Sequence, residues 1–358
     1  MSLIIRDVAL SYGTTQVLKG CSLEIGSGEL ICLVGPSGCG KTTLLNVIAG
    51  VLSPDTGSVE VGGNAVDGLP TRERNLAFIM DRLGLYPHLS VFENIAYPLR
   101  IRKIAPQELN ARVTAICTEV GLDGLEQRRP HQLSAGQQQR VAIARALVRD
   151  DAALLLADES FSNLDAQLRY ELRGAFRRWQ RQRGVTTLFV THDQEEALSL
   201  GDRIALMRSG GIEQFGTAIE LYQDPATLFA ARFFGVPRCN TVPMTGPGGV
   251  PTPFGAALRA SRPDLIPKQR DGSLILGFRP EAVCVEEAQE GPGAGIPLSV
   301  DWAESAGADT ILHLNGPDMP IAARVRGTPD LCTGRPVSAY VDPGAWMVFD
   351  EATGQRVR

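Results

Sequence analysis

The stretch from Gly35 to Thr42, GPSGCGKT, constrains the fold of this chain more than any other. It fits the phosphate-binding pattern G-x-x-x-x-G-K-[ST] at every specified position. The apolar run Leu30 to Val34 before it is typical of a buried parallel strand, and Lys41 to Ala49 after it has the apolar spacing of a helix. Because glycines let backbone N–H groups turn inward at the positive end of a helix, the sequence predicts an anion-binding loop between strand and helix.

The side chains of this loop suit the phosphates of ATP. Lys41 is expected to reach the β- and γ-phosphates, and the hydroxyl of Thr42 to bind Mg²⁺. Cys39 could block nucleotide when oxidised, but an inert small side chain is the favoured interpretation in a reducing compartment. The residues expected to contact the nucleotide here are Gly35, Pro36, Ser37, Gly38, Cys39, Gly40, Lys41, Thr42 and Thr43.

Two further apolar runs end in polar side chains. Ala152 to Ala157 is followed by Asp158 and Glu159, and Thr186 to Thr191 is followed by His192. Open α/β sheets bind ligands at the carboxyl ends of their strands. We therefore expect Asp158 to help hold Mg²⁺, Glu159 to orient or deprotonate the attacking water, and His192 to contact the γ-phosphate.

Composition bounds the class of protein. With 358 residues, 44% of them apolar and 21% charged, the chain is long enough for two globular domains. A formal charge of -5 argues against a nucleic-acid partner. The start has no signal peptide pattern, and no run approaches the ~20 apolar residues of a membrane span, so we expect a cytosolic or peripheral location. Seven cysteines without a CxxC pair indicate reduced thiols.

The remaining pattern predicts an α/β domain over 1–235 and a second domain over 236–358. Leu3 to Ser11 and Gln16 to Ile25 indicate an N-terminal β-layer, and a helical insert is expected over about 87–150. A long helix is predicted from Ala166 to Arg183. The arginines on its polar face are interpreted as a solvated face in preference to a binding patch; they are Arg169, Arg173, Arg177, Arg178 and Arg181.

After Gly235 the composition changes: prolines become frequent, and the apolar periodicity of helices disappears. A domain boundary is therefore expected near Val236. Short alternating segments separated by Gly and Pro predict a small all-β domain, an OB-like barrel. The predicted strands are Ser273 to Phe278, Leu298 to Trp302, Thr310 to Leu314 and Val337 to Val341.

Leu133 to Gln137, LSAGQ, completes a combination that resembles the ATP-binding subunits of ABC transporters over nearly the whole chain. Alone, Ser134 and Gln137 would form a helix capping box. The resemblance implies that this signature faces the γ-phosphate of ATP held by a second ATP-binding subunit, most simply in a homodimer. It also implies that Tyr12 stacks on adenine, and it assigns dimer and nucleotide contacts to Ser134, Ala135, Gly136, Gln137 and Ser162 to Asp165.

Three more segments narrow the resemblance to importers. Leu85 to Leu99, LYPHLSVFENIAYPL, is similar to the stretch that contacts the permease, which implies two transmembrane permease subunits at the cytoplasmic face of the membrane and, indirectly, an extracytoplasmic solute-binding protein. GFRPE at Gly277 to Glu281 and FDEATGQRV at Phe349 to Val357 resemble carbohydrate-importer ATPases of the maltose and glycerol-3-phosphate type. A sugar, polyol or glycerol phosphate is the favoured solute, with polyamine or ferric iron as alternatives.

Two other function classes stay open at this point. One is an ABC-type ATPase that works on nucleic acid or ribosomes, against which the permease-contact stretch and the absence of a basic field count. The other is a nucleotide sensor without turnover, which Asp81 suggests. By its distance from Tyr86, Asp81 stands where a glutamine that touches Mg²⁺ is usual. Ser160 in place of a proline, and Ala135 in place of a glycine, are milder departures.

Asp81→Gln tests what this departure does. A carboxylate could bind Mg²⁺ directly or through water, or its charge could face Asp158 and Glu159 and hold the loop away until the permease is bound. On the second interpretation, Asp81→Gln leaves ATP affinity within a few-fold and raises basal hydrolysis by the isolated subunit, measured as phosphate release. Loss of hydrolysis both alone and in the assembled transporter would instead make the carboxylate an essential ligand.

Overall fold

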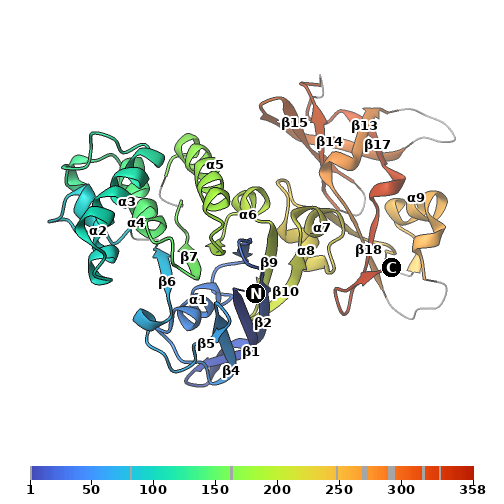
Figure 1. Ribbon diagram of the computed structural model, residues 1–358. Helices are drawn as coiled ribbons and strands as arrows, with labels where there is room; N and C mark the ends of the chain where they lie inside the picture. The colour runs from blue at the N-terminus through green and yellow to red at the C-terminus, as the bar shows by residue number, and fades with distance from the viewer. Residues whose placement is uncertain are drawn as a thin grey trace. The chain divides into compact units, whose positions relative to one another are not determined.

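The computed structural model describes residues 2–80, 83–161, 164–246, 249–267, 273–288, 295–316, 319–329 and 332–358. The chain forms two compact units, Met1–Ala218 and Ile219–Arg358, called here the first and second unit. Figure 1 labels their helices and strands. Among the described residues, no helix combines the length and apolar character needed to cross a bilayer.

The first unit is built on a six-stranded sheet in the order β10-β9-β3-β8-β7-β6. β3 pairs in parallel with β8 on one side and β9 on the other, and β7 pairs in parallel with β8 and β6. All five residues of β3 are buried, as predicted for a strand at the centre of a parallel sheet. The strands are β3 (Leu30–Val34), β6 (Leu76–Ile79), β7 (Leu154–Asp158), β8 (Thr187–Thr191), β9 (Arg203–Arg208) and β10 (Gly211–Gly216).

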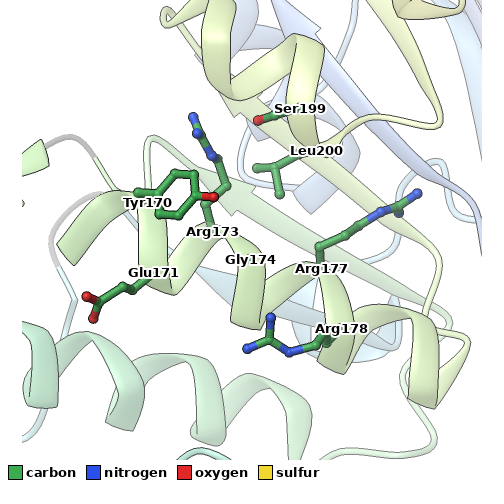
Figure 2. A pocket seen from close by; sticks show the side chains of 8 residues that line it. All are labelled: Tyr170, Glu171, Arg173, Gly174, Arg177, Arg178, Ser199 and Leu200. Carbon is green, nitrogen blue, oxygen red and sulfur yellow. The ribbon is translucent and has the colours of Figure 1, made fainter. Parts of the chain in front are cut away.

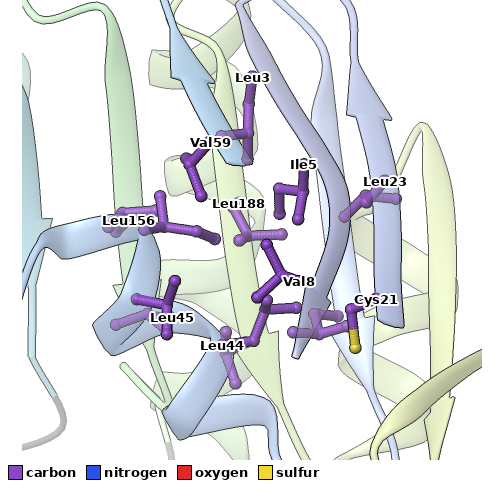
Figure 3. Close-up of a cluster of buried hydrophobic side chains, with 14 of the residues drawn as sticks. Leu3, Ile5, Val8, Cys21, Leu23, Leu44, Leu45, Val59, Leu156 and Leu188 are labelled. Atoms are coloured by element: carbon purple, nitrogen blue, oxygen red, sulfur yellow. The ribbon is translucent and has the colours of Figure 1, made fainter. Parts of the chain in front are cut away.

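An antiparallel sheet in the order β2-β1-β4-β5 forms the predicted N-terminal β-layer. Its strands are β1 (Leu3–Tyr12), β2 (Thr15–Ile25), β4 (Thr56–Val61) and β5 (Asn64–Ala65). Leu3 and Ile5 of β1 share one buried cluster with Leu44 of α1 (Lys41–Ala49), Leu156 of β7 and Leu188 of β8 (Figure 3). Each such side chain contributes roughly 1.5–3 kcal/mol on burial. The shared core therefore fixes α1, and the loop before it, against the strands.

The remaining helices of the first unit begin at recognisable caps. Ser90 and Glu93 form a capping box at the start of α2, and Asp193 caps α6 by accepting from the backbone N–H groups of Glu195 and Glu196. α5 ends at Gly184, which has a φ of 60°. These helices are α2 (Val91–Ile101), α3 (Pro106–Glu119), α4 (Ala135–Leu147), α5 (Ala166–Arg183) and α6 (Gln194–Leu200). α2, α3 and α4 supply the predicted helical insert.

The second unit contains two antiparallel sheets, in the orders β11-β12-β18-β19 and β13-β17-β14-β15-β16. Phe278 of β12 and Leu298 of β14 belong to the same buried cluster, so the two sheets share one core, as expected of the predicted barrel-like domain. The strands are β11 (Asn240–Pro243), β12 (Leu274–Phe278), β13 (Val283–Glu287), β14 (Ile296–Ala306), β15 (Asp309–Asn315), β16 (Ile321–Arg326), β17 (Pro336–Val341), β18 (Met347–Asp350) and β19 (Arg356–Val357).

The boundary between the units falls after Ala218, earlier than the predicted position near Val236. The helices α7 (Ala218–Gln223) and α8 (Leu228–Phe233) are attached to the second unit by the buried guanidinium group of Arg279. That group donates hydrogen bonds to the carbonyl oxygens of Tyr222 at 2.5 Å and Ala231 at 2.9 Å. The rise in proline content marks the point where the strands of the second unit begin. It does not reveal whether the two short helices before that point pack against the first unit or the second.

A helix also interrupts the predicted all-β segment. α9 spans Pro253–Ser261, with Thr252 as its cap and Pro253 in its first turn. Proline suits the first helical position because the N–H it lacks would have no partner inside the helix. The high proline content therefore concealed a helix start, and the expectation that helices disappear after Gly235 was wrong.

A chain that ends at Ala218 tests this division. We expect it to unfold in one cooperative transition, followed by circular dichroism, and to keep Mg-ATP binding, because every residue expected to contact nucleotide precedes it. A chain that ends at Gly235 keeps α7 and α8 without Arg279, so its melt should be broader. A folded Met1–Ala218 chain that fails to bind Mg-ATP would show that the second unit contributes to the nucleotide site.

Candidate active site

The phosphate loop lies between β3 and α1, as its sequence predicts. Gly38 and Gly40 have φ angles of 77° and 108°, in the region that only glycine adopts without strain. At Gly35, a Cβ atom would lie 2.3 Å from the carbonyl oxygen of Met207. Backbone conformation and close packing therefore both require glycine in this loop.

The donors of this loop fit the phosphates of a nucleotide. The side chain of Lys41 is buried, and its Nζ atom donates to the carbonyl oxygens of Gly35 at 2.8 Å and Pro36 at 3.0 Å. Gly40 stands at the cap position of α1 and has no side chain to accept from the N–H groups of the first turn, which also contains no acidic residue. The first turn of α1 thus offers backbone N–H groups without a side-chain cap, next to the ammonium group of Lys41.

The strand register brings the predicted polar residues to the edge of the sheet where this loop begins. Val34 of β3 pairs with Thr191 of β8, and Asp158 of β7 pairs with Val190 of β8. The next residues along the chain are Gly35, His192 and Glu159. Three strands that are neighbours in the sheet therefore end together, and they place an anion-binding loop beside carboxylates and an imidazole.

Glu159 and His192 are already in contact. The Oε1 atom of Glu159 lies 3.1 Å from Nδ1 of His192, and the backbone N–H of Glu159 donates to the carbonyl oxygen of Val190 at 2.9 Å. Glu159 has a φ of 43°, a conformation that costs a non-glycine residue about 1–2 kcal/mol. This strained turn directs the carboxylate toward the strand that carries His192.

The LSAGQ segment forms the start of α4. Ser134 caps the helix: its hydroxyl accepts from the N–H of Gln137 at 3.3 Å, and Gln137 Oε1 accepts from the N–H of Ser134 at 3.0 Å. A Cβ atom on Gly136 would lie 2.7 Å from the side chain of Leu168 on α5, so this position also requires glycine. Ala135 is the first residue of the helix, where an added methyl group is tolerated.

Comparisons with known proteins agree with these features. Residues 18–162 match the family model described as ABC transporter. The chain is 42% identical to the sn-glycerol-3-phosphate import ATP-binding protein UgpC of Paracoccus denitrificans over 99% of both chains, and 41% identical to that of Brucella abortus over 91% of both. The chain belongs to the ATP-binding subunits of ABC transporters.

Two solved structures share the fold of the first unit. One is a dimeric post-hydrolysis ATP-binding cassette with ADP and phosphate, at 30% identity and a TM-score of 0.54 over 60% of this chain and 98% of that one. The other is cbiO1 of Clostridium perfringens, part of a transporter complex, at 26% identity and a TM-score of 0.58 over 62% of this chain and 90% of that one. The ABC protein described here is an importer ATPase that uses ATP with Mg²⁺.

Tyr12 lies at the end of β1, in the hairpin with β2, where it pairs with Thr15. Its side chain is 52% exposed. An aromatic ring that only filled the edge of the sheet would be more buried than this. The ring is therefore accessible to a ligand.

Cys39 has the environment of an inert thiol. Its side chain is buried in the loop, and burial raises the pKa of the thiol despite the nearby ammonium group of Lys41. A raised pKa leaves little of the reactive thiolate at neutral pH.

Ser160 is also buried, and its hydroxyl has no hydrogen-bond partner among the described residues.

Several predicted residues are not described. Asp81, Ser162 and Asn163 lie outside the described residues, so their predicted roles stay predictions from sequence. Leu164 and Asp165 follow directly. The side chain of Asp165 caps α5 by accepting from the N–H of Leu168 at 3.0 Å.

The arginine face of α5 is only partly solvated: Arg178 and Arg181 are exposed, whereas Arg169, Arg173 and Arg177 are half-buried. Arg177 donates to Oδ2 of Asp202 at 3.1 Å, and the guanidinium group of Arg173 lies 5.8 Å from the ring centre of Tyr170. Figure 2 shows Tyr170 and three arginines of α5, Arg173, Arg177 and Arg178, in the lining of a pocket that Ser199 and Leu200 of α6 complete. The contacts of these arginines are therefore accounted for without a bound ligand.

The predicted permease-contact stretch contributes Tyr86, Tyr97 and Pro98 to a cleft of about 320 Å³, called here the β6–α2 cleft, which Arg145 and Arg149 also line. Met80, Tyr97 and Ile101 line it and are exposed. The buried side chain of Asn94 accepts from the N–H of Tyr86 at 2.8 Å and donates to the carbonyl oxygen of the same residue at 3.1 Å. The stretch therefore has a fixed shape and an exposed apolar surface.

One supporting pair was not predicted from the sequence. Thr191, the last residue of β8, donates to Oε2 of Glu196 at 2.6 Å and accepts from the N–H of Asp193 at 3.0 Å. Burial raises the pKa of Glu196, and the hydrogen bond from Thr191 opposes that effect. This pair fixes the turn that carries His192. The sequence signal that could have predicted this pair is a threonine at the end of a strand with a glutamate in the helix that follows.

Proposed function

We propose that this ABC importer ATPase drives uptake of sn-glycerol 3-phosphate or a closely related polyol or sugar compound. The observation that carries the proposal is the 42% identity to the Paracoccus denitrificans protein over 99% of both chains, a span that includes the second unit. Importers of polyamine or ferric iron share the same layout, but none of the relatives compared above has such a name.

Within the site, we propose a division of roles among residues at the strand ends. The backbone N–H groups of residues 37–43, with the ammonium of Lys41, bind and orient the phosphates. Thr42 and Asp158 would hold Mg²⁺, and the bound ion would supply positive charge against the phosphate oxygens. Glu159 orients the attacking water and accepts its proton, and His192, whose Nδ1 atom lies 3.1 Å from the Glu159 carboxylate, contacts the γ-phosphate.

We propose that the protein acts as a homodimer in which two ATP molecules lie between the chains. Ser134, Gly136 and Gln137 of one chain face the γ-phosphate held by the loop of the other. The uncharged start of α4 supports this role, because no carboxylate in its first turn opposes an anion. The adenine ring stacks on the exposed ring of Tyr12.

We propose that the β6–α2 cleft receives a cytoplasmic segment of each of two permease subunits, with a solute-binding protein on the other side of the membrane. Exposed apolar side chains that line a cleft are typical of a protein docking surface. Among the described residues, no helix could span a membrane. The ATPase is then peripheral, at the cytoplasmic face.

Glu159→Gln tests the hydrolytic role and the function together. The amide keeps the shape of the side chain but cannot accept a proton, so hydrolysis should fall by about 10²–10⁴ while ATP binding stays within a few-fold. Phosphate release and nucleotide titration measure the two effects. In cells that lack the native gene, the wild-type chain should restore uptake of labelled glycerol 3-phosphate and Glu159→Gln should not. Wild-type turnover in the variant would refute its role, and restored uptake of a polyamine or ferric iron alone would refute the solute.

Ile101→Glu tests the docking surface. A carboxylate in an apolar contact should weaken copurification with the permease by tenfold or more, because about 2 kcal/mol or more of desolvation is added, whereas basal ATP hydrolysis stays unchanged. Ile219→Glu is the matched control, since Ile219 is 68% exposed against 66% for Ile101 and belongs to the second unit. Equal effects of the two variants would contradict the assignment of the cleft.

A further inference from the structure

The second unit contains a cavity of about 380 Å³ that the ATPase reaction does not use. It lies where the end of α7 meets the turns after β12 and β17 and the last strand, β19. The size is at the lower end of the range for small-molecule sites. The side chains that matter are Tyr222, Arg279, Glu281, Asp342, Trp346 and Arg356, all from the second unit.

Three buried N–H groups belong to side chains that line this cavity and have no hydrogen-bond partner among the described residues. They are Nε of Arg279, Nη1 of Arg356 and Nε1 of Trp346. Trp346 is 4% exposed and Arg279 is 6% exposed. Buried donors are almost always paired in native proteins, so three in the lining of one cavity need a common explanation.

The carboxylates that line the cavity do not accept hydrogen bonds from these three N–H groups. Glu281 accepts from the hydroxyl of Tyr222 at 2.6 Å, and Asp342 Oδ1 accepts from the N–H of Gly344 at 2.8 Å. Arg356 Nη1 lies 3.8 Å from a carboxylate oxygen of Asp224, which is an ion pair but too long for a hydrogen bond. Donors are therefore in surplus, and the missing partner is a group rich in acceptor oxygens.

The charges narrow the chemistry further. Two guanidinium groups are balanced by the carboxylates of Glu281 and Asp342, so the lining carries no excess charge for a polyanion such as a nucleotide. Burial lowers the pKa of Arg356, and burial with the hydrogen bond to Glu281 raises the pKa of Tyr222 to about 12. An anion next to Arg356 would relieve the cost of its burial. The carboxylates can accept from hydroxyl groups.

We propose that this cavity binds a small polyol phosphate or sugar phosphate, with its phosphate on Arg279, Arg356 and Trp346 and its hydroxyl groups on Glu281 and Asp342. Arg279 is held rigidly, because its guanidinium stacks 3.9 Å from the ring centre of Tyr222 and donates to carbonyl oxygens of α7 and α8. The site goes beyond the proposed transport function, since it is a second ligand site on the ATPase chain.

Isothermal titration of the full chain tests the proposal. ADP is added first to saturate the phosphate loop, and glycerol 3-phosphate and glucose 6-phosphate are then titrated separately. We expect at least one of them to bind at one site per chain, with glycerol alone and inorganic phosphate alone at least tenfold weaker. The ADP step reports on the nucleotide site by itself. Failure of ADP to bind would count against the ATPase assignment, and absence of the second binding event alone would overturn only the cavity proposal.

Matched variants locate the site. Trp346→Phe removes one donor and keeps the ring against Phe278, and Arg356→Met removes a cation. Each should weaken binding by tenfold or more, as expected for a lost hydrogen bond to a charged group. Arg358→Met is the control, because Arg358 also pairs with Asp224, at 2.7 Å, but does not line the cavity. Wild-type affinity in both cavity variants, or inorganic phosphate binding as tightly as the esters, would overturn the proposal.

Discussion

The parallel hydrogen-bond ladder that joins β3, β8 and β7 is the constraint on which the catalytic site depends. It pairs Val34 with Thr191 and Val190 with Asp158. Because all three strands run in the same direction, their carboxyl ends must meet at one edge of the sheet. A shift of one residue in any of these strands would move a phosphate ligand, a carboxylate or an imidazole by about 3.3 Å, more than catalysis tolerates.

The same groups that would bind ATP have partners within the free chain. Lys41 donates to two carbonyl oxygens of its own loop, and Ser134 and Gln137 satisfy each other at the start of α4. The donors of Lys41, Ser134 and Gln137 named here therefore have acceptors before nucleotide arrives. These contacts also hold the loop and the helix start near one geometry, so less conformational entropy is lost when a phosphate replaces them.

Elements bounded by strong local signals were predicted to the residue. β3 and α1 are an apolar run and a helix separated by glycines, and α5 ends at Gly184. The residues of the phosphate loop follow from the same local pattern. By contrast, the need for glycine at position 136 arises from Leu168, which is distant in sequence. The boundary of the second unit depends on the contacts of Arg279 with α7 and α8. No periodicity in the sequence encodes either contact.

This difference explains why one ligand site of the chain could be found from sequence and the other could not. The phosphate loop is proposed to bind through backbone N–H groups, so its requirements are glycines at fixed spacing and a helix that follows directly. The cavity of the second unit is built from side chains of Tyr222, Arg279, Trp346 and Arg356, which belong to four separate segments. Such a site has no spacing to recognise, and it becomes visible only as buried donors that share a cavity and have no acceptor of their own.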